Sequence, residues 1–264
     1  AYRLAEYRFK SKEFDQAQAL VNQLLLKTDQ QEILTRSVYM NGQMAAMKND
    51  WPKVSRDMRE LLDRCDDKGV YAKASYWLAE SLYQQQEIEA AADLFEQLIS
   101  KTDLLDANVW PWVALRNAQC QAKLDAWEMV LADSQTARAR YPDFKKNYEH
   151  TYLLGRAMEK QGRLLEAREQ FQMVVASTDG GRTETAAKAQ WRIGETHFHQ
   201  EDYKSAIRAF YKVDSLFTYP RWRTAAIYEA GKCQEHLGNW THAVILYEQL
   251  LRDFPECEYA DEAK

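Results

Sequence analysis

The sequence predicts an all-α protein in which seven helical hairpins stack into a solenoid. Three observations lead to this prediction: a small residue recurs every 37 or 39 residues, apolar residues follow it at fixed offsets, and turn-forming residues separate the helical stretches. One hairpin of two short helices cannot bury its apolar face, so neighbouring copies must cover one another. We therefore expect an array of repeats and not a closed globule.

The most regular column consists of small residues, which leave room for a neighbouring helix to come close. Successive members are separated by 37, 37, 39, 37, 39 and 37 residues. The column comprises Ala5, Gly42, Ala79, Ala118, Gly155, Gly194 and Gly231. We place each member in the first helix of a hairpin.

The second helix of each hairpin is predicted from four columns that lie 9, 12, 16 and 19 residues after the small one. Offsets of three and four residues return to the same face of a helix, so these columns form one buried stripe. The bulky residues that open the stripe are Phe14, Trp51, Ile88, Trp127, Leu164, Tyr203 and Trp240. The fourth copy is the weakest, because its last two columns hold Ser134 and Ala137.

The residues between the helical stretches have the chemistry of turns. Gly162 and Gly238 allow a tight break inside a hairpin, because glycine adopts backbone conformations that other residues avoid. A side-chain oxygen that could cap a second helix is expected at Asp50, Asp125, Asp202 and Asn239. Prolines that cannot continue a helix stand between hairpins at Pro142, Pro220 and Pro255.

These signals divide the chain into a single repeat array over residues 1–264. The hairpins are expected at residues 1–29, 30–67, 68–105, 106–143, 144–181, 182–219 and 220–257, and a further helix is expected to start within 258–264. Because the first copy begins inside its first helix and the last residues begin another one, we expect the chain to be a fragment of a longer protein.

The composition supports a helical protein and argues against several partners. Hydrophobic residues make up 46% of the 264 residues, with only nine glycines and five prolines. The 35 basic and 40 acidic residues are well mixed, whereas a nucleic-acid surface needs a dense positive stripe. No apolar run approaches the ~20 residues of a membrane span. We expect no nucleic-acid partner and no direct membrane insertion.

No group of residues indicates catalysis, a metal ion or a cofactor. His197 and His199 are two positions apart on one helix, so they point to different faces. The four cysteines, Cys65, Cys120, Cys233 and Cys257, show no Cys-x-x-Cys spacing, and we expect no disulfide. The single Gly-Gly pair, Gly180 and Gly181, lacks the Gly-Lys-Ser/Thr that a phosphate-binding loop requires. We therefore expect no enzyme active site.

A column of aromatic residues lies three positions before the small residue of each first helix. Its members are Tyr2, Tyr39, Tyr76, Tyr152, Trp191 and Tyr228, with Leu115 in the fourth copy. Basic residues beside this column or four positions further along the same face are Arg116, Arg156, Arg192 and Lys232. These side chains form the candidate binding surface.

The stretch from Thr224 to Pro255 resembles a tetratricopeptide repeat, because a small-residue pair, a Gly turn, Ala-x-x-x-Tyr and a final Pro follow one another in that order. The resemblance covers nearly the whole chain. It implies a right-handed α-solenoid whose first helices line a concave groove, with the aromatic column facing that groove. The sequence departs from the family pattern, which places Trp one position earlier than the aromatic column does.

A finer resemblance is carried by the connection YEQLLRDFPECEYADEA together with the aromatic column. Both are similar to a bacterial subfamily that includes outer-membrane assembly lipoproteins and Tol-Pal-associated coordinators. Cys257 stands where that pattern has Ser. This resemblance favours the bacterial periplasm or cell envelope, with the cytoplasm as the alternative.

The family resemblance implies a non-catalytic scaffold that binds a peptide or a partner subunit in its concave groove. The residues expected to bind are Tyr39, Tyr76, Arg116, Tyr152, Arg156, Trp191, Arg192, Tyr228 and Lys232, since aromatic and Arg side chains often dominate such interfaces. Alternatively, the tyrosines pack between adjacent first helices and keep only their hydroxyls wet. Two other functions stay open: a recognition or regulatory segment of a multidomain enzyme, and a solenoid that self-associates through its ends.

Overall fold

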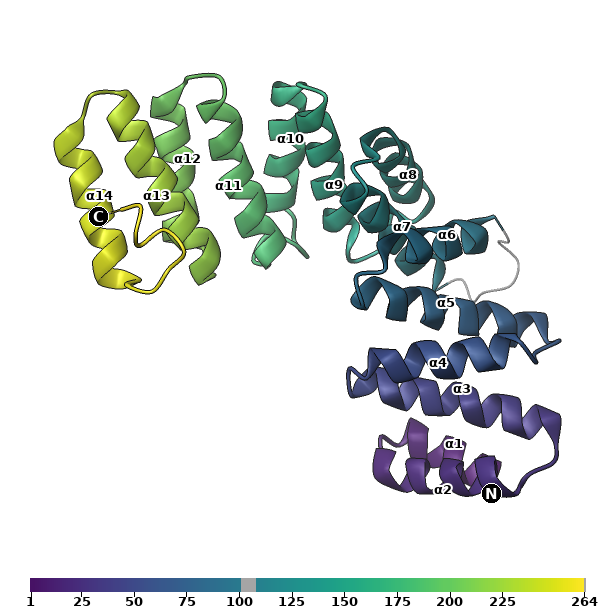
Figure 1. Cartoon of the computed structure of the whole chain (residues 1–264). Helices are drawn as coiled ribbons and strands as arrows, with labels where there is room; N and C mark the ends of the chain where they lie inside the picture. Colours follow the sequence, from purple (N-terminus) through teal and green to yellow (C-terminus); the bar gives the residue numbers. More distant parts are fainter. Residues whose placement is uncertain (101–107, 264) are drawn as a thin grey trace. The chain divides into compact units, whose positions relative to one another are not determined.

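The computed structural model describes residues 1–100 and 108–263, and these residues contain 14 α-helices and no strand (Figure 1). The predicted all-α fold is therefore confirmed. The chain forms two compact units, which we call the N-terminal unit (Ala1–Ala126) and the C-terminal unit (Trp127–Lys264). That the repeats form one continuous array across both units stays a prediction.

The helices alternate between the first and the second member of a hairpin. The N-terminal unit contains α1 (Tyr2–Lys10), α2 (Phe14–Lys27), α3 (Gln31–Met47), α4 (Trp51–Leu62), α5 (Lys68–Gln84), α6 (Ile88–Ile99) and α7 (Trp110–Lys123). The C-terminal unit contains α8 (Trp127–Arg140), α9 (Asn147–Lys160), α10 (Leu164–Val175), α11 (Glu184–Phe198), α12 (Tyr203–Leu216), α13 (Pro220–His236) and α14 (Trp240–Asp253). Each even-numbered helix begins at the bulky residue that was predicted to open it.

The helix pairs lie within the predicted repeat ranges, although the boundary at residues 105 and 106 falls outside the described residues. Turns occupy residues 258–263, and the Ala263 N–H donates to the Tyr259 carbonyl oxygen at 3.1 Å, so the further helix expected from residue 258 stays a prediction. The Tyr259 ring lies on the Tyr228 ring, with ring centroids 4.7 Å apart. The last described residues therefore pack against α13.

All seven members of the small-residue column are buried, and each glycine of the column faces a side chain of the second helix of its hairpin. A Cβ atom added to Gly194 would lie 2.4 Å from Phe210 Cε1, and one added to Gly155 would lie 2.5 Å from Phe171 Cε1. These distances are too short for any carbon–carbon contact. The column therefore sets how closely the two helices of a hairpin approach.

In the weak fourth copy, a side chain from the next copy fills the space beside the small Ser134. Ser134 of α8 stands where α6 and α10 carry buried phenylalanines. The His150 ring of α9 lies against it, with Nδ1 3.4 Å from Ser134 Oγ, and His150 is only 1% exposed. Burial lowers the pKa of His150 to about 4, so the ring fills this space in its neutral form.

One residue in each hairpin turn adopts a left-handed backbone conformation. The seven residues with positive φ are Lys12, Asn49, Gln86, Asp125, Gly162, Glu201 and Gly238. Only two of them are glycine, and a left-handed conformation costs other residues roughly 1 kcal/mol or more. Most turns are therefore strained, which the two predicted glycines did not reveal.

Two of the four predicted helix caps are confirmed, and one is wrong. Asp50 and Asp202 accept hydrogen bonds from the backbone N–H groups of the third residue after them. The cap at Asp125, which Ala126 separates from α8, stays a prediction. The Asn239 amide instead donates to Gln234 Oε1 at 3.0 Å, so it does not cap α14.

The odd-numbered helices form the inner layer of each unit. In the N-terminal unit α5 packs on both α3 and α7, and in the C-terminal unit α11 packs on both α9 and α13. No comparable packing links the even-numbered helices of the described chain. Because helices that pack more closely lie on the inside of a curved stack, the first helices line the inner side.

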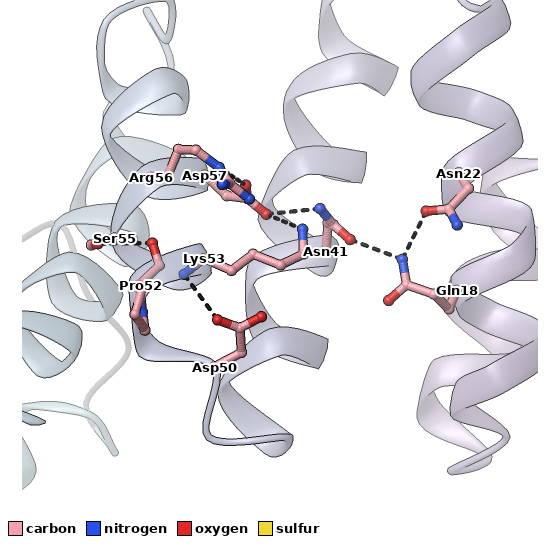
Figure 2. A network of polar contacts seen from close by, with 9 residues as sticks. All are labelled: Gln18, Asn22, Asn41, Asp50, Pro52, Lys53, Ser55, Arg56 and Asp57. Atoms are coloured by element: carbon pink, nitrogen blue, oxygen red, sulfur yellow. Dashed lines mark hydrogen bonds and ion pairs between the residues drawn. The ribbon is translucent and has the colours of Figure 1, made fainter.

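A network of polar side chains joins α2, α3 and α4 of the N-terminal unit (Figure 2). Asn41 of α3 and Asp57 of α4 are each 7% exposed, and Asn41 Nδ2 donates to Asp57 Oδ2 at 2.7 Å. Gln18 Nε2 of α2 donates to Asn41 Oδ1, and Lys53 Nζ donates to Asp57 Oδ2, each at 2.9 Å. The buried Asp57 carboxylate thus has both an amide and an ammonium partner, and the contacts link α2, α3 and α4 in one relative position.

Replacing Asn41 with leucine removes the amide donor from the buried Asp57 carboxylate. We expect this single variant to lower the free energy of unfolding by about 2 kcal/mol, measured by urea denaturation. The double variant Asn41→Leu, Asp57→Leu removes both polar groups and should be close to the parent chain in stability. A double variant that loses as much stability as the sum of both single variants would contradict this account of the network.

Replacing Gly194 with alanine should force Phe210 away from its present position. We expect a loss of about 1 to 3 kcal/mol in the free energy of unfolding, measured by chemical denaturation. The matched control is Gly69→Ala in α5, where the added Cβ meets nothing closer than 3.4 Å. This control should be neutral or slightly stabilising, since alanine favours a helix over glycine. Equal effects at both glycines would show that the helix contact is not the constraint.

Candidate functional site on the inner layer

The two predicted tyrosines of the N-terminal unit meet around one tryptophan. The Tyr39 hydroxyl accepts hydrogen bonds from Trp77 Nε1 at 3.1 Å and from Gln43 Nε2 at 3.3 Å. The Tyr76 ring contacts the Trp77 ring and, edge to face, the Phe95 ring. Burial, aided by the Glu80 charge, raises the pKa of Tyr76 to about 12. Tyr39 is thus linked to α5 through Trp77, and Tyr76 packs against α6 through Phe95.

Arg116 of α7 is held by a carboxylate of α5. Its Nε and Nη2 atoms donate to the two oxygens of Glu80 at 2.7 and 2.8 Å, and its guanidinium lies 4.8 Å from the centroid of the Tyr83 ring. Burial lowers the pKa of Arg116, but Glu80 outweighs that effect and raises it above the ordinary value. A partner's acidic group would have to compete with Glu80 for this bidentate contact.

Tyr152 is the most buried member of the aromatic column in the C-terminal unit. It is 5% exposed and packs against the Phe171 ring at a centroid distance of 5.7 Å. Lys188 Nζ lies 5.0 Å above the Tyr152 ring and 5.7 Å from the Trp222 ring. Tyr152 therefore stabilises the stack and presents little surface of its own.

Trp191 of α11 lies next to Trp222 of α13, with ring centroids 5.6 Å apart. The two indoles differ in their hydrogen bonding. Trp222 Nε1 donates to Glu184 Oε1 at 3.0 Å, whereas Trp191 Nε1 has no hydrogen-bond partner among the described residues. The Trp191 N–H is itself buried, so the half-exposed ring, and not this donor, is the part of Trp191 that a partner can contact.

Paired charges recur on the three inner helices of the C-terminal unit. Each pair joins residues three positions apart: Arg156 with Glu159 at 2.9 Å, Arg192 with Glu195 at 2.6 Å, and Lys232 with Glu229 at 3.1 Å. Arg192 Nη1 also lies 3.6 Å from Glu159 Oε1, which links α11 to α9. The surface thus carries both signs of charge in fixed positions.

Burial and neighbouring charges shift the pKa values of the charged pair formed by Arg192 and Glu195. Burial, together with the nearby charges of Glu159 and Glu229, raises the pKa of Glu195, although Arg192 acts in the opposite direction. Burial lowers the pKa of Arg192, but Tyr152, Glu159 and Glu195 raise it above its ordinary value on balance. The acidic side chains are therefore crowded, and a further cation near Glu195 would relieve them.

Lys232 and Tyr228 form the last part of the surface. Lys232 Nζ lies 5.4 Å from the Phe198 ring centroid and 5.5 Å from the Tyr228 ring centroid. The Tyr228 ring is also stacked against the Tyr259 ring. Burial raises the pKa of Tyr228, so its hydroxyl stays protonated at neutral pH.

All nine predicted residues lie on odd-numbered helices, three in the N-terminal unit and six in the C-terminal unit. We call the six residues of the C-terminal unit the inner surface: Tyr152, Arg156, Trp191, Arg192, Tyr228 and Lys232. Sequence reasoning missed Lys188 and Trp222, which contact this surface. They lie six and nine residues before the small residue of their helix, so extending the aromatic face towards the N-terminus would have found them.

The other chemically reactive residues do not gather into a site. His197 Nδ1 lies 3.5 Å from Asp202 Oδ2, and His199 is exposed at the end of α11. Cys120 and Cys233 are unpaired and fully buried at equivalent positions, and burial raises the pKa of both thiols to about 12. Within the described ranges, no three or more potential metal ligands come together. None of the described helices is long and apolar enough to cross a membrane.

Comparisons with known proteins support the fold. Family models described as tetratricopeptide repeat match residues 56–104, 132–182 and 225–256, which together make up half of the chain. No curated protein sequence matches.

Three solved structures illustrate the similarity in fold. The apo form of RapI has a TM-score of 0.75 and 10% identity, covering 98% of this chain and 77% of that one. The apo quorum sensor NprR from B. thuringiensis has a TM-score of 0.73 and 12% identity, covering 99% and 76%. PilW, described as a widely conserved type IV pilus biogenesis factor, has a TM-score of 0.67 and 17% identity, covering 87% and 97%.

The finer resemblance to outer-membrane assembly lipoproteins and Tol-Pal coordinators is not confirmed by these matches and stays a prediction. The coarser assignment rests on independent findings: repeat matches in both units, alternating first and second helices, and the buried small-residue column. We conclude that this chain belongs to the tetratricopeptide-repeat family.

Proposed function

We propose that this chain is a non-catalytic scaffold that binds a peptide or a partner protein on the inner surface of the C-terminal unit. The observation that carries the proposal is the row of paired charges on α9, α11 and α13, which lies beside the half-buried rings of Trp191 and Tyr228. A peptide can offer both apolar side chains to these rings and charged groups to the pairs. Stacked helical hairpins also provide the extended surface that a peptide needs.

The charge pairs define what kind of partner fits. Because Arg192 and Lys232 are already held by carboxylates three residues away, they lose little side-chain freedom when a partner arrives. The same pairing limits what each charge can add to affinity. We therefore expect aromatic contacts at Trp191 and Tyr228 to supply most of the binding energy, while the charges select partners that carry both signs.

The N-terminal unit is a less suitable binding surface. Arg116 is engaged by Glu80, and the Tyr39 hydroxyl already accepts two hydrogen bonds. The Arg116 donors and the Tyr39 acceptor are thus already used in contacts that join α7 to α5 and α5 to α3. A location in the bacterial cell envelope, favoured by the connection after α14, belongs to the same proposal.

The proposal is tested with peptides selected from a random display library against the intact chain. We expect Trp191→Leu and Lys232→Ala each to weaken the selected peptides about tenfold or more, measured by fluorescence anisotropy. The matched control is Leu165→Ala, on the outer helix α10, where Leu165 is 64% exposed. This control should change the affinity less than twofold.

One outcome would overturn the proposal. Selected peptides that bind the Trp191→Leu and Lys232→Ala variants as tightly as the parent would place the binding surface elsewhere. A Trp191→Leu variant that loses its thermal transition reports on packing alone, and the Lys232→Ala variant, which removes a half-buried charge, then decides the question.

A further inference from the structure

A pocket in the C-terminal unit originates from a missing helical turn. Helix α9 has 14 residues, whereas α13 of the same unit has 17. Residues 141–146 form turns where α13 has its first helical turn. Asn147 Nδ2 holds these turns in place by donating to the carbonyl oxygens of Tyr141 at 2.6 Å and Pro142 at 3.0 Å. The shortened helix leaves open space between α8 and α10.

This space is a pocket of about 570 Å³, which we call the linker pocket. Its volume lies within the roughly 300 to 1,000 Å³ that is typical of small-molecule sites. Helix α8 contributes Arg138, α9 contributes Tyr148 and Leu154, α10 contributes Met173, and Ser177 follows α10. The linker pocket shares no residue with the inner surface.

The Gly-Gly pair, which the sequence left without a function, shapes one wall of the linker pocket. A Cβ atom on Gly180 would lie 2.4 Å from Tyr148 Cγ, so only glycine lets the loop close on this ring. A Cβ atom on Gly181 would lie 2.7 Å from the Ser177 carbonyl oxygen. The Gly180 N–H donates to Ser177 Oγ at 3.1 Å, which leaves the hydroxyl hydrogen of Ser177 available.

The charge on the lining of the linker pocket is positive. Arg138 is the single charged residue that lines it, and no acidic side chain of the described residues does so. The one hydrogen bond of Arg138 is a long contact from Nη1 to Gln170 Oε1 at 3.4 Å. By contrast, Arg223 in the same unit is paired with the Asp214 carboxylate at 2.8 Å. Arg138 is thus a half-buried cation without an anion.

We propose that the linker pocket binds a carboxylate attached to a compact apolar group. The carboxylate would contact the Arg138 guanidinium and the Ser177 hydroxyl, and the apolar group would lie against Leu154 and Met173. A free small acid and the C-terminal residue of a peptide both carry this chemistry. The proposal is independent of partner binding on the inner surface.

The test uses 4-methylpentanoate as the probe and nuclear magnetic resonance of the intact chain as the measurement. We expect the Met173 methyl signal and the Gly180 and Gly181 amide signals to shift on titration, with a Kd of about 1 mM, as suits so small a ligand. The uncharged analogue 4-methylpentanamide should bind at least tenfold more weakly. Peptides that end in leucine, with a free or an amidated C-terminus, show whether a chain end is accepted as well.

Two variants with the same net charge separate the pocket from general electrostatics. Arg138→Gln should weaken 4-methylpentanoate about tenfold or more, because it removes the charge-assisted contact. Arg168→Gln is the control, since Arg168 of α10 donates to Gln200 Oε1 and does not line the pocket. It should leave the Kd within twofold of the parent value.

Equal binding by the Arg138→Gln and Arg168→Gln variants would overturn the proposal. Absence of any shift of the three reporter signals at tens of millimolar probe would do the same. Should Arg138→Gln lose its thermal transition, Met173→Glu replaces it, because Met173 is 47% exposed and tolerates a polar side chain. This variant places a negative charge at the apolar wall, and the glycine amides should then no longer shift.

Discussion

The contact between the two helices of a hairpin is the constraint on which the rest of this structure depends. At Gly155 and Gly194 the facing phenylalanine rings lie so close that no side chain fits between ring and backbone. This approach lets a first helix bury its partner's apolar stripe and still touch the next first helix, as α5 touches α3 and α7 and as α11 touches α9 and α13. The inner layer, and with it the aromatic column, follows from this one spacing.

Much of this fold could be predicted from the sequence, because the interactions that define it are local and periodic. The small residues and the first residues of the second helices recur at fixed offsets, and burial acts on each copy in the same way. The predicted cap at Asn239 failed because its side chain can choose between two partners. Asn239 donates to Gln234 and does not cap its own helix.

The candidate sites were less predictable for the same reason. The sequence indicated which face of each first helix is aromatic and basic, but not that Arg116 would bind Glu80 or that Arg192 would bind Glu195. These contacts depend on the rotation and separation of helices, which periodicity alone does not give. The linker pocket could not be predicted for a further reason. It depends on the residue at which α9 begins, and on lining side chains that a longer α9 would cover.

The turn residues have a consequence for how the two units open. The three complete hairpins of the N-terminal unit turn through Lys12, Asn49 and Gln86, whereas two of the three in the C-terminal unit turn through glycine. More of the N-terminal turns are therefore held in the strained left-handed conformation. The free energy needed to open a hairpin should be lower in this unit than in the C-terminal unit. Amide hydrogens of the N-terminal unit should exchange with solvent first, and proteases should cut its turns before those of the C-terminal unit.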